Sequence, residues 1–272
     1  MQRFSSTPHE MLASLWRNRS LIHALVKREV LGRYRGSVLG LLWSFFNPLL
    51  MLAVYTFVFS VIFQARWGNG SGSKTEFALV LLAGLMVFNL FSECIGRAPG
   101  LILSNTNYVK KVVFPLEILP FVALLSSLFH VLVSLGVWLI AYMLFFGIPH
   151  LTALLIPLVL LPFCLLLMGL SWALASLGVF LRDVSQFIGV AVMMLMFLSP
   201  IFYPASALPK SYQQIIYLNP ITLVVETTRD ILYWGEMPNF TMLGIYWFAT
   251  AVIAWLGFSW FQKTRKGFAD VL

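Results

Sequence analysis

The chain has 272 residues, of which 60% are hydrophobic and only 10% are charged. Soluble domains usually carry about 25% charged residues, so this chain has too few polar side chains to cover a surface that faces water. The apolar stretches are continuous rather than alternating, which favours helices over the strands of a membrane barrel. Composition therefore excludes an ordinary water-soluble protein and predicts an all-α integral membrane protein in a single domain.

Residues 1–36 come before the first long apolar run and are predicted to form cytoplasmic or interfacial helices. Thr7 and Glu10 make a capping box, with Pro8 at the first helical position. A second helix is expected from Ser20. Their one-sided apolar faces are typical of amphipathic helices that lie in the membrane interface, although a helix that packs on the protein shows the same pattern.

Three glycines follow at a spacing of four, at Gly32, Gly36 and Gly40. On a helix they would form a smooth stripe that permits close contact with another helix. The other interpretation is a flexible connection into the first membrane span. The sequence leaves both open.

Six stretches are long and apolar enough to cross a membrane, which takes about 20 residues. They make up a transmembrane domain predicted for residues 37–272. The fourth is the longest, so a tilted or broken helix is expected there. The predicted spans lie near residues 38–63, 75–95, 121–146, 151–181, 184–203 and 240–261.

The basic residues predict the orientation. Segments on the side of the N-terminus hold 14 of the 18 Lys and Arg residues, whereas the opposite side holds only Arg66, Lys74, Lys210 and Arg229. Cytoplasmic loops carry such an excess, so both termini are expected in the cytoplasm. The net charge of +8 then reflects membrane topology and contact with lipids, and no nucleic-acid partner is expected.

Two segments between the spans are not simple loops. Residues 97–120 predict one short cytoplasmic helix held between Pro99-Gly100 and Pro115. Residues 204–239 are too long and too apolar for an ordinary outer loop. There Asn219 reads as an N-cap and Gly235 as a helix stop, and we expect two short helices that dip back into the outer leaflet.

Few groups in the chain could carry chemistry. Glu226 and Asp230 would share a helix face, and paired carboxylates can act as acid and base; a structural ion cluster with Arg229 is the stronger interpretation. The spans are almost free of ionisable residues, apart from His130 and from Glu93, which lies near the end of the second predicted span. No zinc-ligand spacing or nucleophile motif appears. No catalytic residue, metal or cofactor is therefore expected in this chain.

Three stretches carry a family resemblance. GRYRGSVLGLLWSFFNPLL covers residues 32–50, SNTNYVKKVVFPLEILP covers 104–120, and SPIFYP covers 199–204. Together they resemble the membrane (permease) subunit of a type-2 ABC exporter, most closely the branch that exports lipid-linked polysaccharides such as O antigen and teichoic acid.

That resemblance implies a six-helix subunit that forms a homodimer in the bacterial cytoplasmic (inner) membrane. It implies two separate ATP-binding cassette subunits that hold the ATP and Mg²⁺, and a cargo of polysaccharide linked to a polyprenyl pyrophosphate. Residues 204–239 would form an outer gate. The short cytoplasmic helix would couple the two kinds of subunit, with contacts from Arg97, Asn105, Asn107 and Tyr108.

Two further sets of residues are expected to meet this cargo. Cations at the inner interface suit a pyrophosphate, and the candidates are Arg33, Arg35, Lys110 and Lys111. Flat aromatic faces offer a sugar chain contact area with few fixed hydrogen bonds. The candidate path residues are Trp43, Phe46, Tyr55, Phe59, Phe187, Phe197 and Tyr203.

The sequence predicts a permease subunit for ATP-driven export of lipid-linked polysaccharide. A type-2 exporter of another cargo, such as a drug or a small lipid, is the nearest alternative. An intramembrane glycan enzyme that uses Glu226 and Asp230 is a third. The sequence does not identify the sugar, the envelope type of the host or the resting state of the channel.

Overall fold

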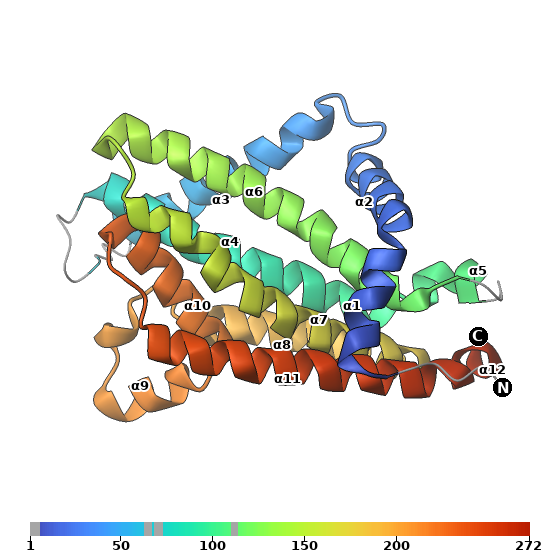
Figure 1. The fold of residues 1–272 in the computed structure, drawn as a ribbon. Coiled ribbons are helices and arrows are strands. Elements are labelled where there is room, and N and C mark those ends of the chain that lie inside the picture. Colours follow the sequence, from blue (N-terminus) through green and yellow to red (C-terminus); the bar gives the residue numbers. More distant parts are fainter. Residues whose placement is uncertain (1–5, 63–66, 68–72, 110–113) are drawn as a thin grey trace.

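The structure, a computed structural model, describes residues 6–62, 67, 73–109 and 114–272, and these residues contain no strand. Long helices lie side by side, and the C-terminus lies at the end of the bundle that carries α5 (Figure 1). The α-helices are α1 (Pro8–Arg17), α2 (Arg19–Arg33), α3 (Trp43–Thr56), α4 (Lys74–Arg97), α5 (Thr106–Val109), α6 (Leu119–Phe146), α7 (Ile156–Phe180), α8 (Val184–Leu198), α9 (Lys210–Tyr217), α10 (Pro220–Arg229), α11 (Phe240–Thr264) and α12 (Phe268–Val271). Short 3-10 or π turns extend several of them, including η2 (Phe57–Ile62) after α3 and η8 (Asp230–Trp234) after α10.

Five helical stretches in the described part of the chain are long and apolar enough to cross a membrane, and α8 is an apolar helix of only 15 residues. At 1.5 Å per residue such a helix rises about 22 Å, less than the ~30 Å hydrocarbon core. The fifth span is thus shorter than expected. It ends at Leu198 because Ser199 precedes Pro200 and adopts an extended backbone.

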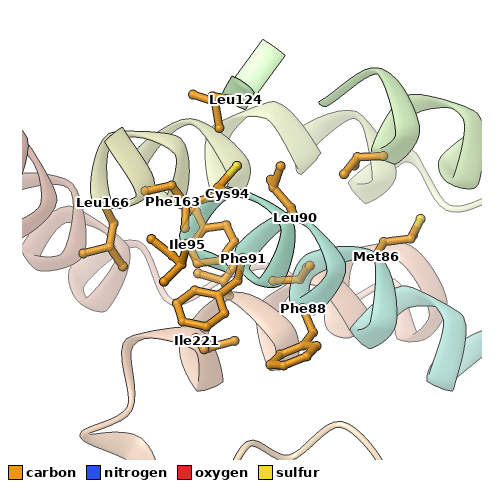
Figure 2. Close-up of a cluster of buried hydrophobic side chains, with 14 of the residues drawn as sticks. Met86, Phe88, Leu90, Phe91, Cys94, Ile95, Leu124, Phe163, Leu166 and Ile221 are labelled. Carbon is orange, nitrogen blue, oxygen red and sulfur yellow. The ribbon is translucent and has the colours of Figure 1, made fainter. Parts of the chain in front are cut away.

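Helix α4 forms the centre of the bundle. Most of its residues between Glu76 and Ile95 are buried. Figure 2 shows how Phe91 and its neighbours on α4 lie among side chains from three other helices, which include Leu124 of α6, Phe163 of α7 and Ile221 of α10. A helix covered on most of its surface must be apolar over that surface, and away from its ends α4 keeps polar residues only on the narrow strip of Asn89, Ser92 and Glu93, which is not fully buried.

Helix α1 forms as its cap predicts, and α2 begins at Arg19, one residue before the expected Ser20. The Thr7 hydroxyl accepts a hydrogen bond from the backbone N–H of Glu10 at 3.3 Å. The apolar face of α2 packs on α6 through Ile22 and Leu25, whereas α1 leaves Leu12 and Trp16 exposed. The apolar face of α2 thus packs on the protein, and the exposed apolar residues of α1 suit the membrane interface.

The glycine-rich connection is not helical. Helix α2 ends at Arg33, and Gly36 and Gly40 have φ angles of 84° and 50°. These left-handed conformations favour glycine and break the helix. The helical stripe is therefore wrong: Gly32 is still part of α2, whereas Gly36 and Gly40 belong to the connection into α3.

Helices α7 and α11 make the closest helix contact in the described residues. A Cβ atom on Gly169 would lie 2.5 Å from the carbonyl oxygen of Ile253, and one on Gly257 would overlap the backbone of Gly169. The Trp247 indole N–H also donates to the carbonyl of Leu158 at 3.1 Å. Small residues let the two backbones approach closely. This packing matters in a membrane because lipid provides no hydrophobic driving force for helix association.

We expect Gly257→Val to lower the stability of the purified protein by about 1–3 kcal/mol, because overpacking forces the backbones apart. Thermal melting in detergent measures this change. Gly244→Val is the matched control on α11, since nothing lies within 4 Å of a Cβ at that position. Equal melting temperatures for the two variants would contradict the close contact.

Candidate functional site

Two of the apolar helices have little protein cover. Ser44 is the only buried residue described on α3, and Val192 is the only one described on α8. Their large apolar side chains, such as Met51 and Met193, are exposed. In a membrane this surface must face lipid, another subunit or a cargo, so it is the first place to look for a function.

Aromatic side chains join α3 to the end of α8 through one residue, Phe202. The Phe202 ring stacks on Phe59 with centroids 4.6 Å apart and lies 5.4 Å from Tyr55 and 6.0 Å from Phe197. The Tyr203 hydroxyl donates to the carbonyl of Phe197 at 3.0 Å. We call Tyr55, Phe59, Phe197 and Phe202 the aromatic cluster.

The seven predicted path residues do not form one site. The aromatic cluster contains Tyr55, Phe59 and Phe197, with Tyr203 beside it. Trp43, Phe46 and Phe187 lie in the first turns of α3 and α8 and are 36%, 40% and 71% exposed. None of these three makes a ring contact with the cluster; the ring next to Phe46 is Phe45, 5.9 Å away.

Sequence reasoning missed Phe202, which is 6% exposed. If the helix continued to residue 203, as the predicted span implies, Tyr203 would line the predicted sugar path and Phe202 would point away from it. Because α8 ends at Leu198, the residues after it do not follow the helical spacing. The Ser199-Pro200 pair is the sequence signal for that stop.

The predicted phosphate-binding cations have different surroundings. Arg33 forms an ion pair with Glu93 of α4, while Arg35 is exposed. Lys110 and Lys111 lie outside the described residues. Arg33 is therefore neutralised within the chain, and Arg35 presents its charge to the surroundings.

The segment after α4 is tied to α2. Arg97 forms an ion pair with Glu29, and Arg28 donates to the Tyr108 hydroxyl at 3.0 Å. The Tyr108 ring stacks on Phe114 with centroids 4.1 Å apart. Two of the four predicted coupling residues thus contact α2 of the same chain.

The other two coupling residues are on the short helical part of this segment. Asn105 donates to the carbonyl of Leu101 at 2.9 Å, and Asn107 on α5 is exposed. The predicted short helix is present as α5, and its exposed side is available to a partner.

Glu117 joins both ends of the chain to the same region. One carboxylate oxygen accepts a hydrogen bond from Ser14 of α1 at 2.8 Å, and the other accepts one from Arg265 at 2.6 Å. The Trp172 indole N–H of α7 donates to the Glu117 carbonyl at 2.9 Å. A movement of the segment that ends at Glu117 would therefore reach α1, α7 and the C-terminal helices.

The segment of residues 204–239, which the sequence predicts on the outer side and which we call the outer segment, is held by the guanidinium of Arg229. This residue is 1% exposed. It donates to the carbonyl oxygens of Val80 at 3.1 Å, Pro200 at 2.5 Å and Ile201 at 2.6 Å, and lies over the Trp67 ring. These partners come from α4, from the break after α8 and from the connection before α4. We call this set of contacts the Arg229 clamp.

The carboxylates of Glu226 and Asp230 have different surroundings. Glu226 accepts a hydrogen bond from Arg229 at 3.0 Å, which confirms the predicted ion cluster for Glu226. Burial, followed by the nearby Glu226 and Glu236 carboxylates, raises the pKa of Asp230 to about 6. Asn219 caps α10 through the N–H of Ile221, as expected.

Comparison with known proteins defines the class. The family described as ABC-2 type transporter matches residues 20–233, which is well over half of the chain. The chain therefore belongs to this family of transporter membrane proteins, and the resemblance carried by its motifs is confirmed.

Individual relatives match over nearly their whole length. The chain is 28% identical over 262 residues to the O-antigen export system permease protein RfbA of Myxococcus xanthus, covering 96% of this chain and 98% of that protein. It is 26% identical over 254 residues to RfbA of Klebsiella pneumoniae, with 93% and 95% covered. It is also 27% identical over 250 residues to the polysialic acid transport protein KpsM of Escherichia coli, with 90% and 93% covered.

We expect Arg229→Met to lower the stability of the protein by about 3–5 kcal/mol, because it leaves three carbonyls and a carboxylate without their cation. The stability of Arg229→Lys should lie between that of the unchanged protein and that of Arg229→Met, because an ammonium lacks the planar guanidinium that reaches all partners. Thermal melting in detergent gives the measurement. Lys210→Met removes an exposed charge from the same segment and should melt as the unchanged protein does; a similar loss in all three variants would refute the clamp.

Proposed function

We propose that this chain is the permease subunit of an ATP-driven exporter that moves lipid-linked polysaccharide across the bacterial cytoplasmic membrane. The observation that carries the proposal is the end-to-end match to proteins named as O-antigen export permeases. A match to a polysialic acid transport protein points to the same class of cargo.

The aromatic cluster supports a sugar cargo on physical grounds. Aromatic rings contact the apolar faces of sugars over a large area without fixed hydrogen bonds, so a chain of sugars can slide past them. The cluster lies where α3 and α8 have little cover, and a second copy of the chain would enclose it. We therefore place the path at a homodimer interface, lined first by Tyr55, Phe59 and Phe197.

The end of the bundle that carries α5 and the C-terminus is placed in the cytoplasm, where the positive charges accumulate. Two copies of an ATP-binding cassette subunit would bind there, with Asn107 among their contacts and ATP and Mg²⁺ on those subunits. The carrier pyrophosphate would meet Arg35, together with Lys110 and Lys111. Arg33 would join them only on leaving Glu93.

An exporter of a drug or a small lipid would share the fold and the ATPase partner. An intramembrane glycan enzyme would need the carboxylates of Glu226 and Asp230, but Glu226 is engaged by Arg229. If Glu226→Gln together with Asp230→Asn left export unchanged, the enzyme hypothesis would be ruled out.

The aromatic cluster provides the test of cargo. In a host without its own copy of the gene, the unchanged chain should restore surface polysaccharide. The double variant Tyr55→Ala and Phe59→Ala should reduce it about tenfold or more, since each aromatic contact contributes about 0.5–1.5 kcal/mol. Quantitative blotting of surface polymer measures the change.

Phe240→Ala with Phe248→Ala is the matched control, because both aromatic residues are exposed on α11. Its export should stay near that of the unchanged chain. Normal surface polysaccharide in the Tyr55 and Phe59 variant, at equal protein level, would argue for a different cargo.

A second experiment tests the ATPase contact. Asn107→Trp adds bulk to the exposed side of α5 and should reduce copurification of the ATPase subunit at least about tenfold, the effect of ~1.4 kcal/mol. Lys210→Trp adds the same bulk at the opposite end of the bundle and should leave copurification intact. The proposal fails if the Lys210 variant loses the ATPase and the Asn107 variant keeps it.

A further inference from the structure

A partly open cavity of about 400 Å³, lined by both apolar and polar side chains, lies between the end of α2 and helices α3, α4 and α6. Its polar lining includes Ser44 and Asn47 from α3, Asn89 and Ser92 from α4, and His130 and Ser134 from α6. Polar side chains within membrane spans are costly unless they meet water, a partner or a ligand. Three helices that each turn polar groups toward one space therefore indicate a binding site.

The spacing of these groups shows that the lining is one continuous surface. Ser44 and Asn47 are one turn apart on α3, as are Asn89 and Ser92 on α4. Asn89 is exposed although its neighbours Phe88 and Leu90 are 3% and 1% exposed. The amide thus opens onto the cavity from the most buried helix of the bundle.

Two buried polar atoms of the lining residues lack a hydrogen bond; the Oε1 atom of Glu93 forms an ion pair with Arg33, which leaves the Nε2 atom of His130 for a ligand. The Nε2 atom of His130 is buried without a hydrogen-bond partner, while its Nδ1 atom lies 3.4 Å from the Tyr34 hydroxyl. A buried polar atom without a partner costs free energy comparable to a lost hydrogen bond. A group that entered the cavity and bonded to this nitrogen would recover that cost.

The charge of the lining selects an uncharged ligand. Arg33 and Glu93 are its charged members, and they neutralise each other in an ion pair. The remaining amides, hydroxyls and imidazole both donate and accept hydrogen bonds, which matches the hydroxyl groups of a sugar. A phosphate would instead require an excess of positive charge.

The cavity also borders the aromatic cluster. Tyr55 lines the cavity and its ring lies 5.4 Å from Phe202. We infer that this cavity is a side pocket that binds one uncharged, hydroxyl-rich group, a sugar residue of the cargo, next to the aromatic path. The inference rests on the proposed function and adds a site within each subunit, behind α3. A lipid headgroup rich in hydroxyls, such as phosphatidylglycerol, is the other source of this chemistry.

The test uses the whole transporter in lipid nanodiscs, with Ser92→Cys as a reporter inside the cavity and the native Cys94 and Cys164 replaced by Ala. A small water-soluble thiol reagent should modify Cys at position 92. Octyl glucoside or octyl galactoside, below the concentration that forms micelles, should slow this modification about fivefold or more, as expected for one or two hydrogen bonds.

Two variants sharpen the result. Adding Asn89→Leu to the reporter should abolish the protection by the sugar amphiphiles. Lys210→Cys places the thiol on an exposed polar position outside the lining, and its modification should not respond to the sugars.

The outcomes decide between the sources. Slowing by phosphatidylglycerol in the disc, with no effect of either glycoside, would assign the cavity to lipid and overturn the inference. No reaction at position 92, or no protection by any compound, would overturn it as well. The proposed function is tested separately by surface polysaccharide, so a cavity that fails while export still depends on Tyr55 and Phe59 refutes the side pocket alone.

Discussion

The structure depends on the burial of one cation, the guanidinium of Arg229. A buried charge is tolerated only when its hydrogen bonds and its charge are satisfied. Three backbone carbonyls, the Glu226 carboxylate and the Trp67 ring do so here, and Gly84 leaves the space that the guanidinium fills. Because those carbonyls belong to α4 and to the break after α8, they anchor α10 to both of these elements.

That constraint extends to the aromatic cluster. The carbonyls of Pro200 and Ile201 that Arg229 binds directly precede Phe202, the residue on which Tyr55, Phe59 and Phe197 converge. A helix with as little cover as α3 is thus connected to the buried α4 partly through an arginine on α10. The aromatic surface proposed for the cargo is thus linked to α10 through the Arg229 clamp.

The opposite end has a comparable set of ties. Glu29 pairs with Arg97 and Arg28 with Tyr108, so α2 is tied to the segment that carries α5. The ion pair of Arg33 at the end of α2 lies in the lining of the cavity between α2, α3, α4 and α6. The segment that carries α5 thus contacts α2, whose last residue lines the cavity, and Glu117 connects the start of α6 to α1 and to the C-terminal helices.

The sequence by itself determined the elements whose causes are local: the apolar spans, the caps at Thr7 and Asn219, and the short helix between its breakers. These need only neighbouring residues. Only the tertiary structure decided which side of each apolar helix is covered, since protein interior and lipid accept the same side chains. It also decided that Arg33 faces Glu93, that Arg229 meets Val80, and that Phe202 lies at the centre of the aromatic cluster, because these partners are far apart in the chain and no helical spacing relates them.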